Sequence, residues 1–544
     1  MNKYEKYAAA AAFLLFSATL TPWAFNFPLN DDWAYALPVR GLALTGRLAL
    51  SDWGSSTQLL HVLFGALWTK LFGFSFGALR VMNLLLAAGA IVMFVKLLEE
   101  FEAGRFEKLA AGLTLAFNPL YLVLANSFMT DVHYFFWMTS ALYFYVRRLK
   151  DPADGKALFL AGLCTAAAYL TRQLAVALPL AFSVSLLLKG RPKLRELALT
   201  WAAPAAAIFG YALWFKLAHG PTWASENYVT ASTLAHVAKP LAFANDSLYR
   251  LFASMSETGL LLLPLAAGYV FSLRQFTSRN LAGCRVSPSG PWLALAVMAG
   301  FSLLNGALPY LENTISVSGL GARTLAGAAM KPSGIFASSF FWTAATAAAG
   351  AAAVFLMCAS GLALRAGSPA LRFVFLASFV QLAVSLLGAK YFDRYLLPTL
   401  VPWFAVAAVF AARGIKFYRP AAGLALALYA LLGWAGMKDY LAWNQAKWEL
   451  AGRSAAMLPK EAISNGFDFD AWQNYERNMA YLKGMKPLKQ IGEWEWQAIN
   501  KYKAKITFAQ DPRLIVLDTA EYSTPLSSRK GVLYLMAPKA PAGR

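Results

Sequence analysis

Charged residues are scarce in this sequence. Asp, Glu, Lys and Arg make up 14% of the 544 residues, and hydrophobic residues make up 58%, whereas soluble domains carry about 25% charged residues. This shortage excludes an ordinary soluble domain and predicts a polytopic membrane protein. Cysteine is scarce too: the three cysteines fall in predicted spans or a predicted cytoplasmic loop, so we expect no external disulfide.

The sequence also lacks the motifs of nucleotide and nucleic-acid binding. It has no Gly-rich phosphate loop, no C-x-x-C pair and no basic tract interleaved with aromatic residues, which argues against ATP hydrolysis and against a nucleic-acid partner. The formal net charge of +21 has another origin. Most basic residues lie in short gaps between apolar runs, as they do in the cytoplasmic loops of membrane proteins.

These basic gaps orient the chain in the membrane. Four of them, at residues 147–156, 189–195, 274–285 and 413–419, should be cytoplasmic. The first apolar run ends in Thr-Pro-Trp-Ala-Phe rather than in a small-residue cleavage site, so we interpret it as a retained helix and not as a signal peptide. Residues 58–72 are short and contain His61 and Lys70; keeping the four gaps on one side requires them to lie on the outer surface as an interfacial helix.

Apolar runs of about 20 residues then predict spanning helices. There are thirteen, at approximately 7–26, 77–97, 107–125, 128–147, 157–172, 173–188, 197–217, 252–272, 291–309, 336–364, 371–389, 395–412 and 420–437. The N-terminus is expected inside. An odd number of spans places the C-terminus outside. We therefore expect a protein of the cytoplasmic (inner) membrane with its C-terminus in the periplasm.

A transmembrane domain is therefore predicted at residues 1–437, with a first outer loop at 27–76, and a second domain at 438–544. Charged, polar and apolar residues mix in this second domain in soluble proportions. The stretches EAISNGFDFDAW, KITF, PRLIVLD and GVLYLMAP predict short strands, and residues 440–454 predict a helix. We expect a small extracytoplasmic α/β domain, here called the cap.

The candidate site residues are ionisable groups near the outer ends of the predicted spans. They are Asp31, Asp32 and Asp52 in the first outer loop, Asp131 with His133, Arg172, and the charged residues of the stretch AKYFDRYLLP, which are Lys390, Asp393 and Arg394. Such groups are costly at membrane depth unless they are paired or face a wet cavity. They are therefore functional candidates.

Each candidate also has a structural alternative. The aspartates could cap helices that begin beside them, and Arg172 and Arg394 could extend to the interface. Two adjacent acids exceed what one cap needs, and Arg394 lies beside Asp393 between two tyrosines, a costly cluster for a simple anchor. We interpret His133 as a polar lining residue rather than as a metal ligand.

Sugar transfer from a lipid phosphate would use this layout. The polyprenyl tail of such a donor lies in the bilayer and its phosphate lies at the surface, where Arg or Lys can bind it. A carboxylate can deprotonate the acceptor hydroxyl or hold a cation. A second carboxylate nearby raises the pKa of the first toward the range of a useful base.

The sequence resembles the membrane-embedded GT-C glycosyltransferases. The motifs that carry the resemblance occur in the family's order: Asp31-Asp32-x-x-Tyr35 followed by Gly46, then LFGFSFGALRVMN, NSFMTDVHYFFW, AAYLTRQLAVALP and YFDRYLLPTLVP. The branch that they resemble contains the dolichyl-phosphate-mannose protein mannosyltransferases and the bacterial aminoarabinose transferases of lipid A. The resemblance covers about residues 1–437, and NGFDFDAWQNY is similar to stretches in the cap of bacterial members.

The resemblance implies a role for each candidate. Asp31, Asp32 and Asp131 would be catalytic, Arg394, Tyr395, Arg172 and Lys390 would bind the donor phosphate, and Tyr35, His133 and Asp393 would line the substrate cavity. Asp31 would act as the base or help to hold a cation, and Asp131 would support it from across the cavity. The expected enzyme is an inverting hexosyl- or pentosyltransferase that moves a sugar from a polyprenyl-phosphate donor to a lipid, glycan or protein acceptor.

The stretch WGSSTQ at residues 53–58 departs from the family pattern. Relatives often carry Lys-Pro-Pro there, sometimes with an acid that binds metal. This departure argues against a bound metal. If a divalent cation is bound, its candidate ligands are Asp31, Asp131 and His133.

Two rival functions share the polytopic, basic composition. One is a transporter or flippase of lipid-linked sugars, which typically places ionisable residues near the bilayer midplane on broken helices, whereas those of this chain cluster at one predicted surface. The other is a polysaccharide polymerase or ligase, which uses the same surface chemistry and differs in its product.

Overall fold

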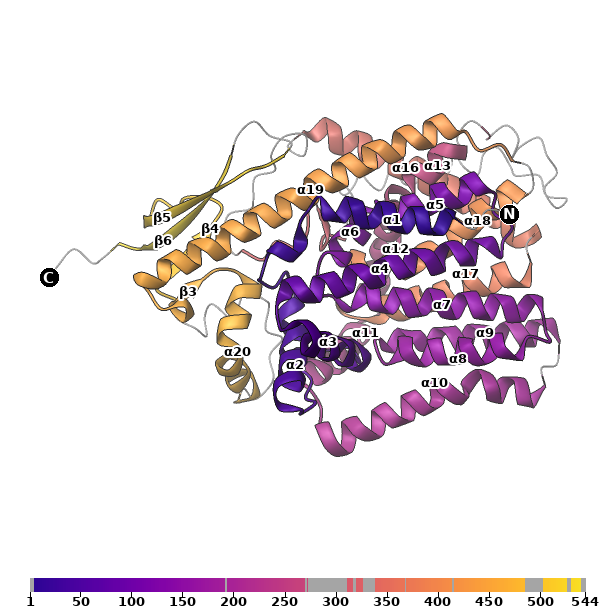
Figure 1. The fold of residues 1–544 in the computed structure, drawn as a ribbon, viewed down its shortest axis with the longest axis horizontal. Helices are drawn as coiled ribbons and strands as arrows, with labels where there is room; N and C mark the ends of the chain where they lie inside the picture. Colours follow the sequence, from indigo (N-terminus) through magenta and orange to yellow (C-terminus); the bar gives the residue numbers. More distant parts are fainter. Residues whose placement is uncertain are drawn as a thin grey trace.

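The computed structural model describes residues 4–190, 193–269, 272, 311–316, 319–325, 338–366, 368–412, 415–484, 502–525 and 530–539. They form a helical body with a small C-terminal sheet at one end (Figure 1). Within these residues, five helices are long and apolar enough to cross a membrane, or seven if each of two bent pairs is one span. The prediction of a polytopic helical membrane protein is confirmed, and the count of thirteen spans stays a prediction.

The seven candidate spans overlap predicted ones. They are α4 (Phe76–Glu99), α5 (Arg105–Ala116) with α6 (Pro119–Ala125), α10 (Leu194–Trp214), α12 (Pro240–Leu261) with α13 (Leu263–Tyr269), α16 (Ser339–Ala366), α17 (Pro369–Leu387) and α19 (Arg419–Arg453). The α12–α13 pair begins at Pro240, well before the predicted span at 252–272. Other predicted spans fall on α1 (Glu5–Ala18), α7 (Thr130–Lys150), α8 (Gly155–Tyr169), α9 (Ala177–Lys189) and α18 (Val401–Ala412). The predicted span at 291–309 and the basic gap at 274–285 lie outside the described residues.

The two bent pairs meet at their breaks. α5 and α6 are bent by 58°, and α12 and α13 by 69°. The Asn118 side chain accepts hydrogen bonds from the first turn of α6 and donates to the Leu261 carbonyl oxygen at 3.1 Å. One buried amide therefore satisfies backbone groups that both breaks would otherwise leave unpaired.

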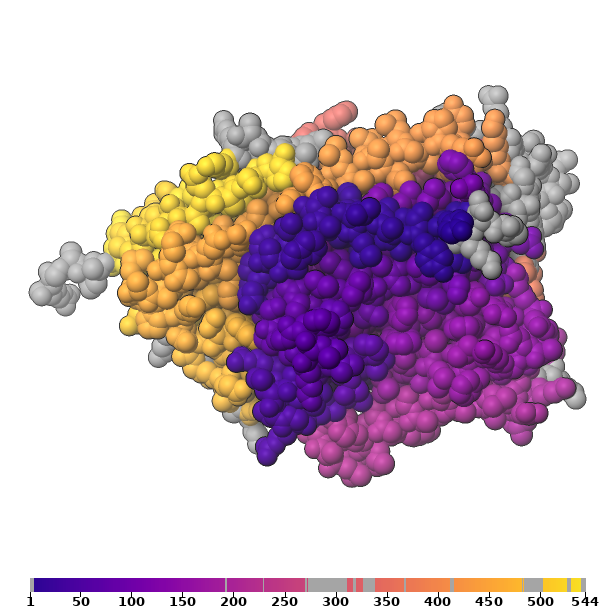
Figure 2. Space-filling view, in the orientation of Figure 1, coloured from indigo at the N-terminus to yellow at the C-terminus, as the bar shows by residue number. Residues whose placement is uncertain are grey.

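The first outer loop lies at the end of the body that carries the sheet. It contains α2 (Asp32–Thr45) and α3 (Leu59–Phe72). In Figure 1, α2 runs across the ends of the spans rather than along them. In the space-filling view, the indigo N-terminal part of the chain packs directly against the orange part that leads into the cap (Figure 2).

The helix α19 joins the helical body to the cap. It continues for 35 residues without a break, through the predicted boundary at 437, so the separate helix predicted at 440–454 is the second half of one long helix. The cap sheet contains β3 (Ile463–Ser464), β4 (Ala504–Thr507), β5 (Leu514–Tyr522) and β6 (Gly531–Pro538) in the order β3-β4-β6-β5. β3 and β4 are parallel, and the other pairs are antiparallel.

One strand prediction is wrong. The stretch EAISNGFDFDAW is a strand only at Ile463–Ser464, and α20 (Phe467–Gly484) follows. The alternation of Phe and Asp resembled a half-buried strand, but all four residues are buried. The Asp470 carboxylate accepts a hydrogen bond from the Asn465 N–H at 2.7 Å, and Asp468 pairs with Lys447 at 2.6 Å. These partners allow the acids to be buried in a helix, which the alternation cannot reveal.

Candidate active site

A cavity of about 440 Å³ lies between α2, the turn after α8 and the segment after α17. We call it the first cavity. Six predicted site residues line it: Asp31, Tyr35, Arg172, Lys390, Arg394 and Tyr395. The fold thus brings candidates from the beginning, middle and end of the predicted transmembrane domain to one cavity.

Asp31 and Arg394 form an ion pair on the cavity wall. Arg394 Nη1 lies 3.1 Å from Asp31 Oδ2, and the two side chains are 9% and 18% exposed. Asp31 precedes α2 but its side chain accepts no capping hydrogen bond. The guanidinium of Arg394 lies 5.0 Å from the ring centre of Phe392. The predicted structural alternatives, a helix cap and a free interfacial arginine, do not describe these contacts.

Asp131 and Arg172 form a second ion pair. Arg172 Nη1 lies 3.0 Å from Asp131 Oδ1, and Nη2 donates to Asp131 Oδ2 at 3.1 Å. Arg172 Nε donates to Thr130 Oγ1 at 3.0 Å. Asp131 lies in the first turn of α7, whose capping position is Met129, and it is 3% exposed. It therefore holds Arg172 at the cavity from behind.

Tyr395 lies between the two guanidinium groups. Its ring centre is 5.7 Å from Arg394 and 5.8 Å from Arg172, within the range of cation–π attraction. Burial and the charge of Asp31 raise the pKa of Tyr35 to about 12, although both guanidinium groups oppose the shift. The phenol of Tyr35 thus stays protonated beside two acids and two guanidinium groups whose charges cancel.

Asp32 points away from the pair that Asp31 makes. Its Oδ1 accepts a hydrogen bond from the Phe128 N–H at 2.8 Å, and its Oδ2 accepts one from the Leu29 N–H at 3.2 Å. Arg80 Nη2 lies 3.9 Å from the same oxygen, and both side chains are fully buried. The adjacent acids therefore have different surroundings: Asp31 lines the cavity and Asp32 joins two loops behind it.

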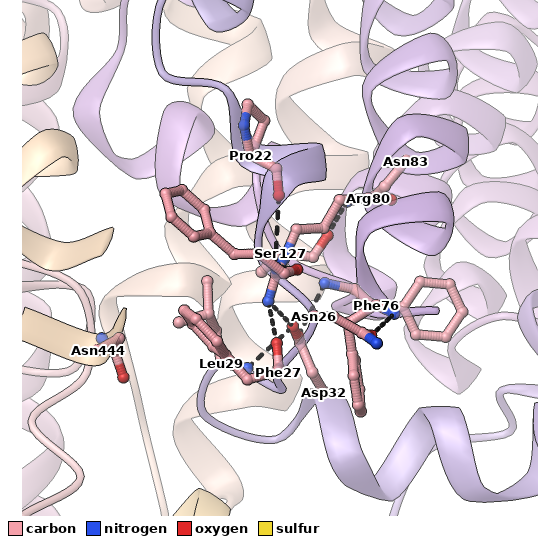
Figure 3. Close-up of polar contacts among 12 residues, drawn as sticks. Pro22, Asn26, Phe27, Leu29, Asp32, Phe76, Arg80, Asn83, Ser127 and Asn444 are labelled. Carbon is pink, nitrogen blue, oxygen red and sulfur yellow. Dashed lines mark hydrogen bonds and ion pairs between the residues drawn. The ribbon is translucent and has the colours of Figure 1, made fainter. Parts of the chain in front are cut away.

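Buried side chains of α4 complete this network (Figure 3). Arg80 donates to the carbonyl oxygens of Phe25, at 2.7 Å, and of Phe27. Asn83 Nδ2 donates to the Ser127 carbonyl oxygen at 2.7 Å. One helix thus holds the segment before Asp31 and the segment before Asp131. Sequence reasoning assigned no role to Arg80, although its charge in an apolar helix was a signal.

Two predicted cavity residues lie elsewhere. Asp393 is fully buried, and its Oδ2 accepts hydrogen bonds from the backbone of a loop at 314–315. His133 is also buried, and its ring centre lies 4.2 Å from that of His61. Neither Asp393 nor His133 is among the described residues that line the first cavity.

The divergent stretch at 53–58 forms part of the cavity wall. Trp53, Gly54, Ser55 and Ser56 line it. Gln173, beside Arg172, donates from Nε2 to the Ser55 carbonyl oxygen at 3.1 Å, which fastens the stretch to the turn that carries the arginine. Sequence reasoning did not include these four residues among the site candidates. The sequence signal that could have found them is their departure from the family motif.

Metal ligands are not gathered at this cavity. Across the described parts of the chain, no group of three or more His, Cys, Asp or Glu side chains could hold a metal ion. The carboxylates of Asp31 and Asp131 each face an arginine, and His133 faces another imidazole. The described residues do not fit the divalent cation that was an open alternative.

Comparison with known proteins identifies one segment. Residues 58–216 match the family described as dolichyl-phosphate-mannose-protein mannosyltransferase. The matched segment includes Asp131 and Arg172 and excludes Asp31 and Arg394, and the match confirms the predicted resemblance. No curated protein matches the chain in sequence.

Several solved structures resemble the chain. ArnT from Cupriavidus metallidurans, bound to undecaprenyl phosphate, is 14% identical with a TM-score of 0.41, and the match covers 97% of each chain. The Archaeoglobus fulgidus oligosaccharyltransferase is 16% identical with a TM-score of 0.45, covering 90% of this chain and 61% of that one. The S. cerevisiae Pmt1-Pmt2 complex, bound to its sugar donor, is 13% identical with a TM-score of 0.32, covering 43% and 37%.

Proposed function

We propose that this protein is an inverting glycosyltransferase that moves a hexose or pentose from a polyprenyl-phosphate donor to an acceptor hydroxyl. The observation that carries the proposal is the convergence of two acid–guanidinium pairs on Tyr395 at one cavity. Such a site can bind a phosphate and supply a base within the reach of one small molecule. The match of residues 58–216 to a mannosyltransferase family supports the same chemistry.

Arg394 and Lys390 are the proposed phosphate ligands. Both line the cavity. Arg172 is engaged by both oxygens of Asp131 and by Thr130, so its role is to position Tyr395 and to add positive charge. The apolar cavity residues Leu174, Val384 and Leu387 suit the first part of a polyprenyl chain that enters from the surrounding membrane lipids.

Donor binding would activate the base. Without donor, the Asp31 carboxylate is engaged in the ion pair with Arg394. A donor phosphate competes for the same guanidinium and releases Asp31. The carboxylate then accepts the proton of the acceptor hydroxyl, whose oxygen attacks the anomeric carbon while the bond to the phosphate oxygen breaks. Polyprenyl phosphate leaves with the bonding electrons, and its charge is held by Arg394 and Lys390.

A single displacement of this kind inverts the anomeric centre. Tyr35 stays protonated at ordinary pH because its pKa is raised to about 12, so it can donate a hydrogen bond but cannot replace Asp31 as the base. Asp32 would act as a positioning residue, since its two oxygens tie the segment that carries Asp31 to the segment before Asp131.

The proposed orientation places the site and the cap in the periplasm and the N-terminus in the cytoplasm. Figure 1 shows the N-terminus at the end of the body opposite the sheet. Two predicted cytoplasmic gaps lie close to each other, because Lys189 Nζ donates to the Leu149 carbonyl oxygen at 2.9 Å. Lys150 of the first gap also pairs with Glu100 at 3.3 Å. Basic residues on that side support a cytoplasmic location.

The proposal can be tested by incubating the purified protein with a panel of polyprenyl-phosphate sugars and with lipid, glycan and peptide acceptors. Asp31→Asn should lower turnover by about 10²–10⁴-fold, as expected for loss of a general base. Asp52→Asn is the matched control, because Asp52 lies in the same outer loop but pairs with Lys483 of the cap at 2.7 Å. Full turnover by folded Asp31→Asn would remove Asp31 from the mechanism, and lipid-linked sugar movement without a transfer product would favour a transporter.

A further inference from the structure

A second cavity of about 350 Å³ adjoins the first. Asn30, Asn313, Lys390 and Phe392 line both cavities, so the two meet directly beside Asp31. Asn30 has a φ of 50°, in the left-handed region that Asn adopts more readily than most residues. The volume falls within the range of about 300–1,000 Å³ typical of small-molecule sites.

The second cavity has a different chemistry from the first. Among the described residues, no Leu, Ile or Val lines it, so it offers little to a polyprenyl chain. Its polar lining residues are Asn30, Glu312, Asn313, Ser316, Arg323, Thr324 and Lys390. Amides and hydroxyls can bind sugar hydroxyl groups. Of the lining residues that the structure describes, Arg323 and Lys390 are cationic and Glu312 is acidic, which leaves an excess of positive charge among them. Phe392 and Phe467 add apolar ring surface.

One end of the cavity wall is fastened to the catalytic segment. The Asp393 carboxylate, next to Arg394 in the chain, accepts hydrogen bonds from the backbone N–H groups of Thr314 at 2.6 Å and Ile315 at 2.7 Å. The hairpin of β1 (Ile315–Ser316) and β2 (Gly319–Leu320) begins at this point. These hydrogen bonds therefore fix the position of the second cavity's wall relative to Arg394 in the first cavity.

The other end of the wall is fastened to the cap. The Thr324 carbonyl oxygen accepts a hydrogen bond from the Phe467 N–H at 2.8 Å, and Thr324 Oγ1 accepts one from Lys447 Nζ at 2.7 Å. Lys447 is fully buried and pairs with Asp468 of α20 at 2.6 Å. A wall held at both ends is preorganised, which lowers the entropic cost of binding.

We propose that the second cavity binds the acceptor, and that this acceptor is an anionic saccharide, a sugar that bears a carboxylate or a phosphate. This inference rests on the proposed function, because it assigns the donor to the first cavity. The acceptor hydroxyl would reach Asp31 through the junction at Asn30 and Asn313, while Arg323 and Lys390 attract the negative group. Acceptor recognition would thus come mainly from residues before the cap, and among the described lining residues the cap would add the ring of Phe467.

The proposal can be tested without the natural acceptor by measuring how well a bound ligand protects an engineered cysteine from labelling. The full-length protein is used, with its three native cysteines replaced by serine. Glu312→Cys places an exposed reporter in the second cavity, and the rate of its labelling by a maleimide is measured. The probes are glucuronic acid, glucose 6-phosphate, glucose, inorganic phosphate and a neutral peptide. The two charged sugars should slow labelling at concentrations about tenfold lower than glucose or phosphate alone, because only they combine ring contacts with charge.

Charge reversal supplies the second arm. Arg323→Glu should abolish protection by the charged sugars, whereas Arg47→Glu should retain it, because Arg47 is an exposed cation of the first outer loop. Thermal unfolding checks that both variants are folded. Equal protection by glucose, stronger protection by the peptide, or protection that survives Arg323→Glu would overturn the proposal.

A second reporter separates this proposal from the proposed function. Ser55 is exposed and lines the first cavity, so Ser55→Cys should be protected by undecaprenyl phosphate in vesicles. If undecaprenyl phosphate fails to protect Ser55→Cys, the assignment of the donor site fails. If it protects Ser55→Cys while no saccharide protects Glu312→Cys, the donor site stands and the acceptor proposal is overturned.

Discussion

Replacement of Arg394 by alanine should weaken donor binding far more than it destabilises the fold. The guanidinium pairs with Asp31 at 3.1 Å, and the partner carboxylate is 18% exposed on an open cavity. Loss of the arginine therefore leaves Asp31 in contact with water, so the cost in unfolding free energy should stay below the about 3–5 kcal/mol of a fully buried pair. Loss of a charge-assisted hydrogen bond to phosphate costs about 1.5–3 kcal/mol, which is roughly a 10–150-fold weaker donor affinity.

Arg80→Ala is the comparison variant, because it should show the opposite pattern of stability loss and donor affinity. Arg80 and its partner Asp32 are fully buried, and Arg80 also donates to backbone carbonyl oxygens. Its removal leaves a buried carboxylate without its cation, which costs about 3–5 kcal/mol. We therefore expect Arg80→Ala to lower the unfolding temperature sharply, while the folded fraction retains its affinity for polyprenyl phosphate.

Two measurements on each variant decide the matter: the dissociation constant for undecaprenyl phosphate and the thermal unfolding midpoint in detergent. Arg394→Lys should be intermediate in affinity, because it keeps the charge and loses the two-pronged geometry. Unchanged donor affinity in Arg394→Ala, or equal losses of affinity and stability in Arg394→Ala and Arg80→Ala, would refute the assignment of Arg394 to the phosphate.

Three further predictions concern the supporting residues. Lys447→Met should cost about 3–5 kcal/mol of stability because it leaves Asp468 buried and unpaired, and the double variant with Asp468→Leu should recover most of it in thermal unfolding. Burial raises the pKa of Asp470 from 3.8 to about 7, so between these values the folded cap keeps a proton that the unfolded chain releases. The free energy of unfolding should therefore fall as pH rises from about 4 to 7, by at most about 4 kcal/mol. Asp470→Asn should flatten this pH dependence. Asp32→Asn should lower the unfolding temperature and leave the affinity for undecaprenyl phosphate unchanged, whereas a loss of affinity without a loss of stability would place Asp32 in the donor site.

The helical body and the cluster of site residues could be predicted from the sequence to a large extent. Long apolar runs and basic gaps are local signals, because a span must be apolar along its length. They located the seven candidate spans, including both bent pairs, although the bends themselves depend on contacts such as that between Asn118 and Leu261. The cap was harder, since the alternating Phe and Asp residues of α20 resemble a strand until the partners of the acids are known.

The sequence by itself determined which ionisable residues needed an explanation, because charge in an apolar chain is costly wherever it lies. Only the tertiary structure decided how those charges are divided. Asp31 and Asp32 are neighbours in the chain, but one meets Arg394 at a cavity and the other meets Arg80 in the interior. Successive side chains at the start of a helix point in different directions, so their partners come from whichever distant segments the fold places on each side. Those partners depend on long-range packing that no local pattern encodes. The same is true of the second cavity, which forms where Phe467 of the cap meets the segment that contains Lys390 and Phe392.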